Sequence, residues 1–114
     1  MSGLVLTRRI GQRLMLGLPA THVLSVRAIT ARAAVVLIVP LLHGGPTVHQ
    51  VSRGGSGVEA LPGLILSLDT VYRANDVVER RVAQLRLQAI RARVPIWREE
   101  LYDDVLAGVL GAAA

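Results

Sequence analysis

The residues near the start of the chain show a two-residue alternation that predicts β-structure. Residues 4–10 alternate along a strand, which places Arg8 on the same face as Leu6. Gly11 allows a turn, because glycine adopts backbone conformations that other residues avoid. A short second strand follows over 13–16. The pattern therefore predicts a β-hairpin that carries cationic groups near its end.

The remainder of the chain contains further short runs rich in apolar and β-branched residues, which favour a mainly β fold. The segments 43–46 and 53–57 are rich in glycine and predict a flexible, turn-rich stretch, and 73–76 predicts a turn or a helix cap. A helix is expected from Glu99 onward, where acidic residues suit a helix N-terminus. No internal repeat is evident. The expected strands cover residues 22–29, 33–39, 64–69, 83–90 and 93–97.

Positive charge is concentrated in the first half of the chain. All 13 cationic residues are arginines. Six of them precede residue 59 and no Asp or Glu does, whereas seven arginines and eight carboxylates occur from residue 59 onward. The formal charge of +5 is thus the sum of +6 and −1. This asymmetry is typical of a surface that binds a polyanion, and the alternative is a solvated arginine-rich surface with no ligand.

Several classes of protein are disfavoured by what the sequence lacks. There is no cysteine, which excludes disulfides and thiolate chemistry. The three histidines have no ligand-like spacing with carboxylates, so we expect neither a metal nor a cofactor. No nucleophile motif or phosphate-binding loop is present, and we expect no enzymatic activity. The longest apolar run, 33–42, has ten residues where a membrane helix needs roughly twenty, so a soluble, cytoplasmic protein is expected.

Two widely separated segments resemble the carbon storage regulator family (CsrA/RsmA), small dimeric bacterial proteins that bind messenger RNA. The first is LVLTRRIGQRLMLG at 4–17, and the second is VPIWREELY at 94–102. Residues 84–87, QLRL, also resemble the fourth strand of that family. The three segments occur in the order that the resemblance requires.

The resemblance implies both a domain organisation and a fold. The whole chain, 1–114, would be one domain with a core of 1–30 and 81–110. About 31–80 would be an insertion between the third and fourth strands. Members of the family are intertwined homodimers of five-stranded subunits, barrel-like or sandwich-like, each with a C-terminal helix. The first strand of one subunit lies beside the last strand of the other, so each dimer has two composite sites.

The implied function is post-transcriptional regulation by binding GGA-containing mRNA near the ribosome-binding site, in the 5′ untranslated region. A bound dimer would block ribosome access, acting as a repressor, or would alter mRNA stability. The partners implied are such mRNAs, a second copy of the chain, and a protein antagonist or small regulatory RNA, with no membrane. The RNA-binding positions carried over are Leu6, Thr7, Arg8 and Arg9 in the first strand and Val94, Ile96, Trp97, Arg98 and Glu99 in the last.

Arg98 is the strongest candidate for an essential RNA contact, because an arginine fork can hold a phosphate or the edge of a guanine. Arg8 and Arg9 are expected to supply phosphate attraction and a salt-dependent affinity. The alternative for Arg98 is a local ion pair with Glu99 or Asp103 at the start of the helix.

Trp97, Glu100 and the function as a whole each have an alternative interpretation. Trp97 stands where the family usually has a histidine or a small residue, and it would either stack on a base or pack against the helix. Glu100 is better explained by helix capping than by function. The rival function is a protein-interaction module in which RNA binding has been lost and the apolar run 33–42, within the insertion, binds a protein partner.

Overall fold

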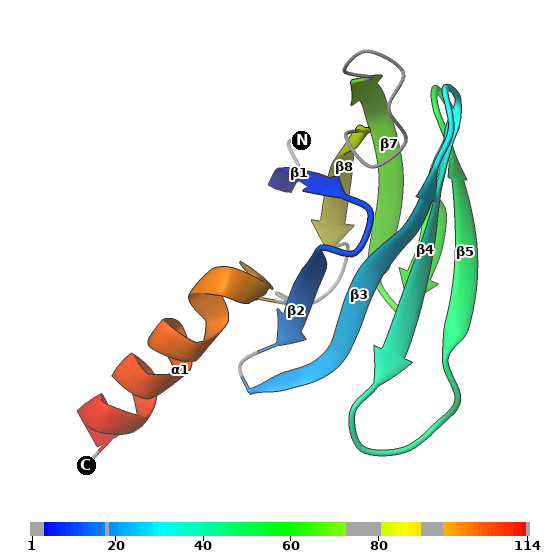
Figure 1. Ribbon diagram of the computed structural model, residues 1–114. Coiled ribbons are helices and arrows are strands. Elements are labelled where there is room, and N and C mark those ends of the chain that lie inside the picture. Colours follow the sequence, from blue (N-terminus) through cyan, green and yellow to red (C-terminus); the bar gives the residue numbers. More distant parts are fainter. Residues whose placement is uncertain (1–3, 18, 73–80, 90–94, 114) are drawn as a thin grey trace.

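The structure is a computed structural model that describes residues 4–17, 19–72, 81–89 and 95–113. It is mainly β, as the sequence predicts, with antiparallel strands in two sheets and a helix at the C-terminal end (Figure 1). The turn expected at 73–76 and the expected start of the last strand, 93–94, lie outside the described residues. The strands are β1 Leu4–Arg9, β2 Arg13–Gly17, β3 Ala20–Ile29, β4 Ala33–Pro40, β5 Thr47–Ser52, β6 Val58–Leu61, β7 Leu64–Tyr72, β8 Val82–Ala89 and β9 Ile96–Arg98, and the helix is α1 Glu99–Ala113.

The two sheets enclose one hydrophobic core. Sheet A has the strand order β1-β8-β7-β6, and sheet B has the order β5-β4-β3-β2-β9. Both sheets contribute fully buried leucines to the same cluster, such as Leu24 from sheet B and Leu66 from sheet A. Burial of side chains of this size contributes roughly 1.5–3 kcal/mol each to folding.

The first two strands do not pair with each other. β1 pairs with β8 in sheet A, whereas β2 pairs with β3 and β9 in sheet B. The predicted hairpin is therefore wrong, although both of its strands are confirmed. Gly11, with φ of 87°, turns the chain from one sheet into the other, and its N–H donates to the Val26 carbonyl at 2.9 Å. Alternation identifies the faces of a strand but does not identify its pairing partner.

The segment expected as an insertion supplies four strands, β4 to β7, and a large share of the core. Strands are confirmed at 33–39 and 64–69, and bends and turns are confirmed in the glycine-rich segments 43–46 and 53–57, but the stretch between these two segments is not a loop. β5 lies within that stretch and pairs with β4. Its sequence, TVHQVS, hides the strand because only Val51 reaches the core. The buried residues of this segment are Ala34, Val36, Ile38, Val51, Ala60, Leu64, Leu66 and Leu68.

The chain contains a structural repeat that its residues do not reveal. Strands β1 to β4 and strands β5 to β8 have the same connectivity. When β1 to β4 are matched in order to β5 to β8, the order β1-β8-β7-β6 of sheet A corresponds to β5-β4-β3-β2, which is the order found in sheet B. The match extends to a bulge, because Arg27 in β3 and Asp69 in β7 are each skipped in the pairing with the following strand. β9 and α1 stand outside the repeat.

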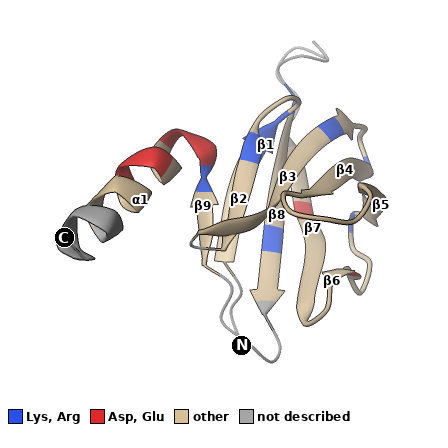
Figure 2. Ribbon diagram, turned by 90° about the horizontal axis from the view of Figure 1, so that it is seen from below, with Lys and Arg blue, Asp and Glu red and all other residues tan. Residues whose placement is uncertain are grey.

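β9 and α1 complete one end of the molecule. β9 adds a fifth strand to sheet B at the edge of β2, and α1 begins at the next residue. The helix extends away from the sheets (Figure 1), and its acidic first turns follow directly on the basic end of β9 (Figure 2). Tyr102 anchors it, since this side chain is buried and its hydroxyl accepts a hydrogen bond from the Ala20 N–H at 2.8 Å. Within the described part of the chain, no helix is both long and apolar enough to cross a membrane.

Candidate nucleic-acid interface

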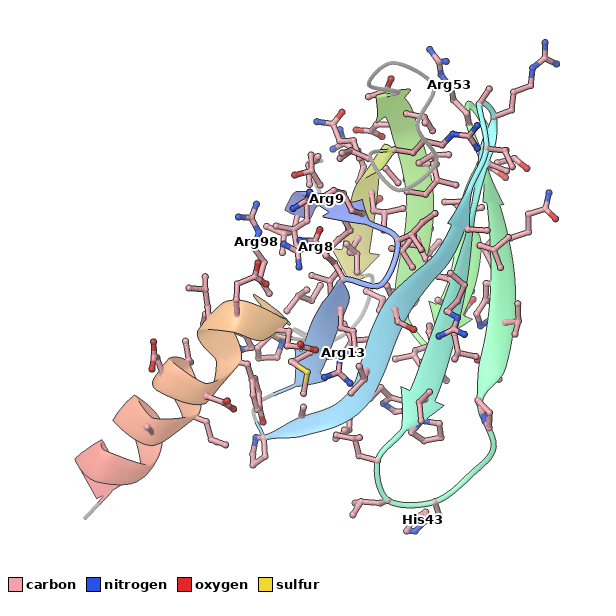
Figure 3. All side chains as sticks on the ribbon, in the orientation of Figure 1. Arg8, Arg9, Arg13, His43, Arg53 and Arg98 are labelled. Atoms are coloured by element: carbon pink, nitrogen blue, oxygen red, sulfur yellow. The ribbon has the colours of Figure 1, made fainter. Side chains whose placement is uncertain are left out.

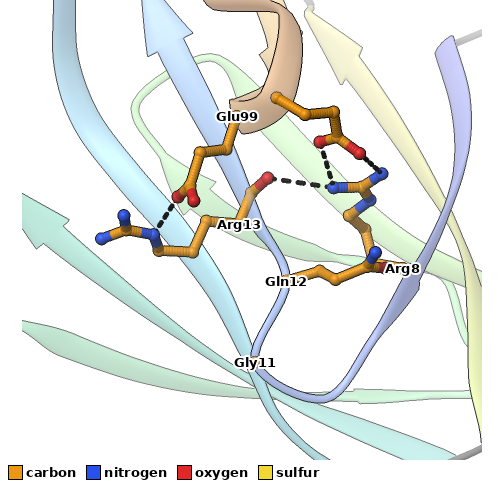
Figure 4. Close-up of a pocket in the computed structure, with 6 residues that line it drawn as sticks. Arg8, Gly11, Gln12, Arg13 and Glu99 are labelled. Atoms are coloured by element: carbon orange, nitrogen blue, oxygen red, sulfur yellow. Dashed lines mark hydrogen bonds and ion pairs between the residues drawn. The ribbon is translucent and has the colours of Figure 1, made fainter.

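The two ends of the chain meet where the edges of the two sheets adjoin. β1 is the end strand of sheet A, and β9 is an end strand of sheet B. Arg8 of β1 joins them through Glu100 in the first turn of α1. Its Nη1 donates to Glu100 Oε1 at 3.0 Å, and its Nη2 donates to Oε2 at 3.1 Å (Figure 4). A fork-to-fork pair of this kind fixes the orientation of both groups as well as their separation.

The Arg8 side chain is buried, with only 4% of its surface exposed. Alternation along β1 places it on the inner face with Leu6, which packs against the core. Besides Glu100, it donates from Nε to the Thr7 carbonyl at 2.8 Å and from Nη1 to the Arg13 carbonyl at 3.2 Å. These bonds satisfy a cation that would otherwise be costly to bury. Arg8 therefore holds the junction together, which differs from the surface phosphate contact expected of it.

The ion pair also changes the chemistry of the Glu100 carboxyl group. Its hydrogen bond with Arg8, aided by a backbone hydrogen bond, lowers the pKa of Glu100 from 4.5 to about 2. The positive charges of Arg8 and Arg98 act in the same direction. Glu100 therefore stays ionised at any pH near neutrality, so the clamp between β1 and α1 stays closed.

A second ion pair lies beside the first. Arg13 at the start of β2 donates to the Glu99 carboxylate, and both side chains are about half exposed. Exposed pairs of this kind stabilise a fold by about 0–1 kcal/mol. The two pairs border a shallow pocket of about 250 Å³ (Figure 4). Its lining residues are Arg8, Gly11, Gln12, Arg13, Glu99 and Glu100.

Arg9 and Arg98 are the arginines of β1 and β9 that lie outside these two ion pairs. Arg9 is exposed at the end of β1 and Arg98 is half-buried at the end of β9. Figure 3 shows their side chains on the same side of the molecule, next to Arg8 and away from Arg53. Arg98 makes no ion pair with Glu99 or Asp103, all three of which lie in the described part of the chain. The local pairing considered for Arg98 is thus not seen.

Two buried donors on β9 have no hydrogen-bond partner among the residues that the structure describes. They are the Nε of Arg98 and the Nε1 of Trp97. An unsatisfied buried donor costs roughly 1–3 kcal/mol, so such groups are unusual in a folded protein and call for an explanation. Both donors lie on the same short strand, directly before the helix. Because they belong to neighbouring residues of a strand, the two side chains point to opposite faces of the sheet.

The other expected site residues divide between surface and core. Thr7 is exposed on β1, next to Arg9. Leu6 and Ile96 are half-buried and pack against the core, and Ile96 lies opposite Leu16 in the sheet. Val94 lies outside the described residues. The structure thus gathers the remaining expected residues at one junction, of which Thr7, Arg9 and Arg98 offer polar groups without an ion pair in the described part of the chain.

Sequence reasoning missed two residues that shape this junction. Gln12 accepts a hydrogen bond from the Arg9 N–H at 2.8 Å through its side-chain oxygen, which fixes the end of β1. Glu100 was assigned only to helix capping, yet it holds Arg8 from 92 positions away. No local pattern could reveal that pairing, because the two residues meet only after the sheets have formed.

The fold is small and mainly β, and both ends of the described chain meet at a junction that contains arginines and carboxylates. No protein-family model, curated protein or solved structure matches this chain. The resemblance to carbon storage regulators therefore depends on the sequence segments 4–17, 84–87 and 94–102 alone.

Proposed function

We propose that this protein binds single-stranded or loop RNA containing GGA and regulates translation or mRNA stability. The observation that carries the proposal is the position of Arg9 and Arg98. They come from opposite ends of the sequence, lie at adjoining sheet edges, and make no ion pair with any residue that the structure describes, whereas Arg8 and Glu100 pair with each other. These are also two of the positions that the family resemblance selects.

The chemistry of the junction suits unpaired RNA. A guanidinium can bind phosphate or pair with the O6 and N7 edge of guanine. β1 and β9 are both end strands, so each has one edge whose peptide groups do not pair within its sheet. Such groups can bind the base edges of unstacked nucleotides. Trp97 adds an indole N–H without a partner, and its ring could stack on a base.

The proposed mechanism is steric and needs no covalent chemistry. A protein bound over a ribosome-binding site competes with the ribosome for the same nucleotides. Bound elsewhere in a transcript, it would protect or expose the RNA to degradation. Regulation then depends on the affinity for the RNA and on the concentration of the protein.

A titration with two matched RNAs tests the proposal. One RNA is a hairpin with GGA in its loop, and the other has CCA at the same place. We expect gel-shift titrations to give tight binding of the first only, with a loss of at least tenfold in Arg98→Ala. Arg53→Ala is the matched control, since Arg53 is exposed and lies away from the junction (Figure 3). Equal affinity for the two RNAs, or no binding at low salt, would overturn the proposal.

The outer face of sheet B favours a second candidate, a module that binds a protein partner. Val48 is 67% exposed and lies opposite Leu37, which lines a second pocket together with Val39 and Leu41. The positions of sheet A that the structural repeat matches to this face are polar. They include Arg86 and Asp69, which form an ion pair at 2.7 Å. The same pocket is also lined by Arg13, Ser25 and Arg27, and exposed apolar side chains with polar residues at their rim are typical of an interaction surface. Absence of RNA binding in the titration above would favour this candidate.

A further inference from the structure

We propose that a single chain carries one complete RNA site and that a second copy is needed neither to form the site nor to fill it. This inference rests on the proposed function and goes beyond it. It concerns the number of chains and of RNA molecules in the active complex. The homodimer with two sites that the resemblance implies is the alternative.

The first support is that the strand pairings at the junction lie within one chain. β1 pairs with β8 over six residue pairs, from Leu4 opposite Leu87 to Arg9 opposite Val82. β9 pairs with β2 through three more. In the dimer implied by the resemblance, the first strand of one subunit meets the last strand of another. Here the Arg8–Glu100 clamp joins the two within a single polypeptide.

The second support is the structural repeat, which explains how one chain can do this. β1 to β4 and β5 to β8 have the same connectivity and an equivalent bulge. Each half supplies strands that the other half pairs with: β8 of the second half pairs with β1 of the first, and β4 of the first pairs with β5 of the second. The second half thus acts as an internal partner for the first, and the segment 31–80 contributes most of it.

The third support is that the repeat is unequal, which leaves one site rather than two. Sheet B has five strands and sheet A has four. The fifth strand of sheet B is β9, at the edge of β2, and within the described residues no strand pairs with the equivalent edge of β6. The first half passes from Pro40 at the end of β4 to Thr47 at the start of β5, with neither a strand nor a helix between them.

The side chains at the equivalent place are also unsuited to RNA. The strand register identifies them. Arg8 lies opposite Ala83 in the first junction, and Val51 lies opposite Ala34 in the second, so Val51 is the counterpart of Arg8. Arg9 is matched in the same way by Ser52. The second junction therefore lacks the arginine pair of β1 as well as the counterparts of β9 and α1. One site per chain follows.

A subunit-mixing experiment distinguishes one chain from two. Arg9→Ala and Arg98→Ala chains are each titrated with the GGA hairpin, then unfolded together, refolded as an equal mixture and titrated again. If the site is shared between subunits, mixed dimers regain one site with both arginines. If the site lies within one chain, every site keeps one defect. We expect no recovery of binding in the mixture.

Controls make each outcome decisive. Wild-type protein taken through the same unfolding and refolding must regain its RNA affinity, and circular dichroism must show that both variants fold. Sedimentation is expected to give the mass of one chain, 12.2 kDa, for the free protein and the mass of one chain plus one RNA for the complex. Recovery of binding, or a complex of two chains, would overturn the inference and leave the proposed function standing. Failure of the wild type to bind would overturn both.

Discussion

Arg8 and Glu100 form a bidentate ion pair across 92 positions of sequence, with the guanidinium buried and the carboxylate 54% exposed. The asymmetry between the partners has a consequence for stability. Removal of Glu100 leaves a buried cation without its counter-ion, whereas removal of Arg8 leaves a carboxylate that water can solvate. The two residues therefore contribute unequally, although they form one interaction.

Substitution of each partner should reveal this inequality. We expect Glu100→Ala to lower the melting temperature more than Arg8→Met, because methionine can fill the buried position without a charge. The double variant should be more stable than Glu100→Ala alone. Urea titrations of the four proteins form a double-mutant cycle that measures the coupling. Equal losses in the two single variants would contradict a buried Arg8.

The lowered pKa of Glu100 predicts an acid-sensitive junction. Because the pKa falls from 4.5 to about 2 on folding, the stabilisation is fully present above about pH 4.5 and is lost as the pH falls toward 2. We expect the free energy of unfolding to decrease over that range more steeply in the wild type than in Glu100→Gln. Urea titrations at several pH values check this, and parallel curves for the two proteins would show that Glu100 does not keep its low pKa.

The sequence predicts the strands better than it predicts their partners. Residues 4–10, 33–39 and 64–69 alternate or are strongly apolar, and each forms a strand. β5 and β6 escape notice because they are short and place few side chains in the core. The hairpin prediction fails because β1 pairs with β8 whereas β2 pairs with β3 and β9, so the two strands belong to different sheets. Arg8 looks like a surface cation for the same reason, since its partner is known only once β9 and α1 are in place.

The middle segment should behave as core rather than as a removable insertion. Leu66 of β7 is fully buried in the same cluster as Leu24 of β3. We expect Leu66→Ala and Leu24→Ala each to lower the free energy of unfolding by about 2–5 kcal/mol. The surface substitution Leu42→Ala, at a side chain 83% exposed, is the matched control and should have little effect. A near-neutral Leu66→Ala would show that the segment folds apart from the core.

Arg9 and Arg98 should affect RNA binding in different ways. Arg9 is exposed and is expected to neutralise a phosphate, so Arg9→Ala should weaken binding to both the GGA and the CCA hairpins. It should also reduce the slope of log affinity against log salt by about 0.7, the value per phosphate for single strands. Arg98→Ala should instead reduce the preference for GGA. Titrations over a series of salt concentrations separate these effects, and identical changes in the two variants would contradict the assignment.

We propose that both ends of one chain build one RNA site around the Arg8–Glu100 clamp. Native mass spectrometry of the protein mixed with an excess of the GGA hairpin tests it most directly. We predict a single complex that contains one chain and one RNA, which disappears when the hairpin carries CCA. A complex with two chains, or a spectrum with only free protein and free RNA, would contradict the claim.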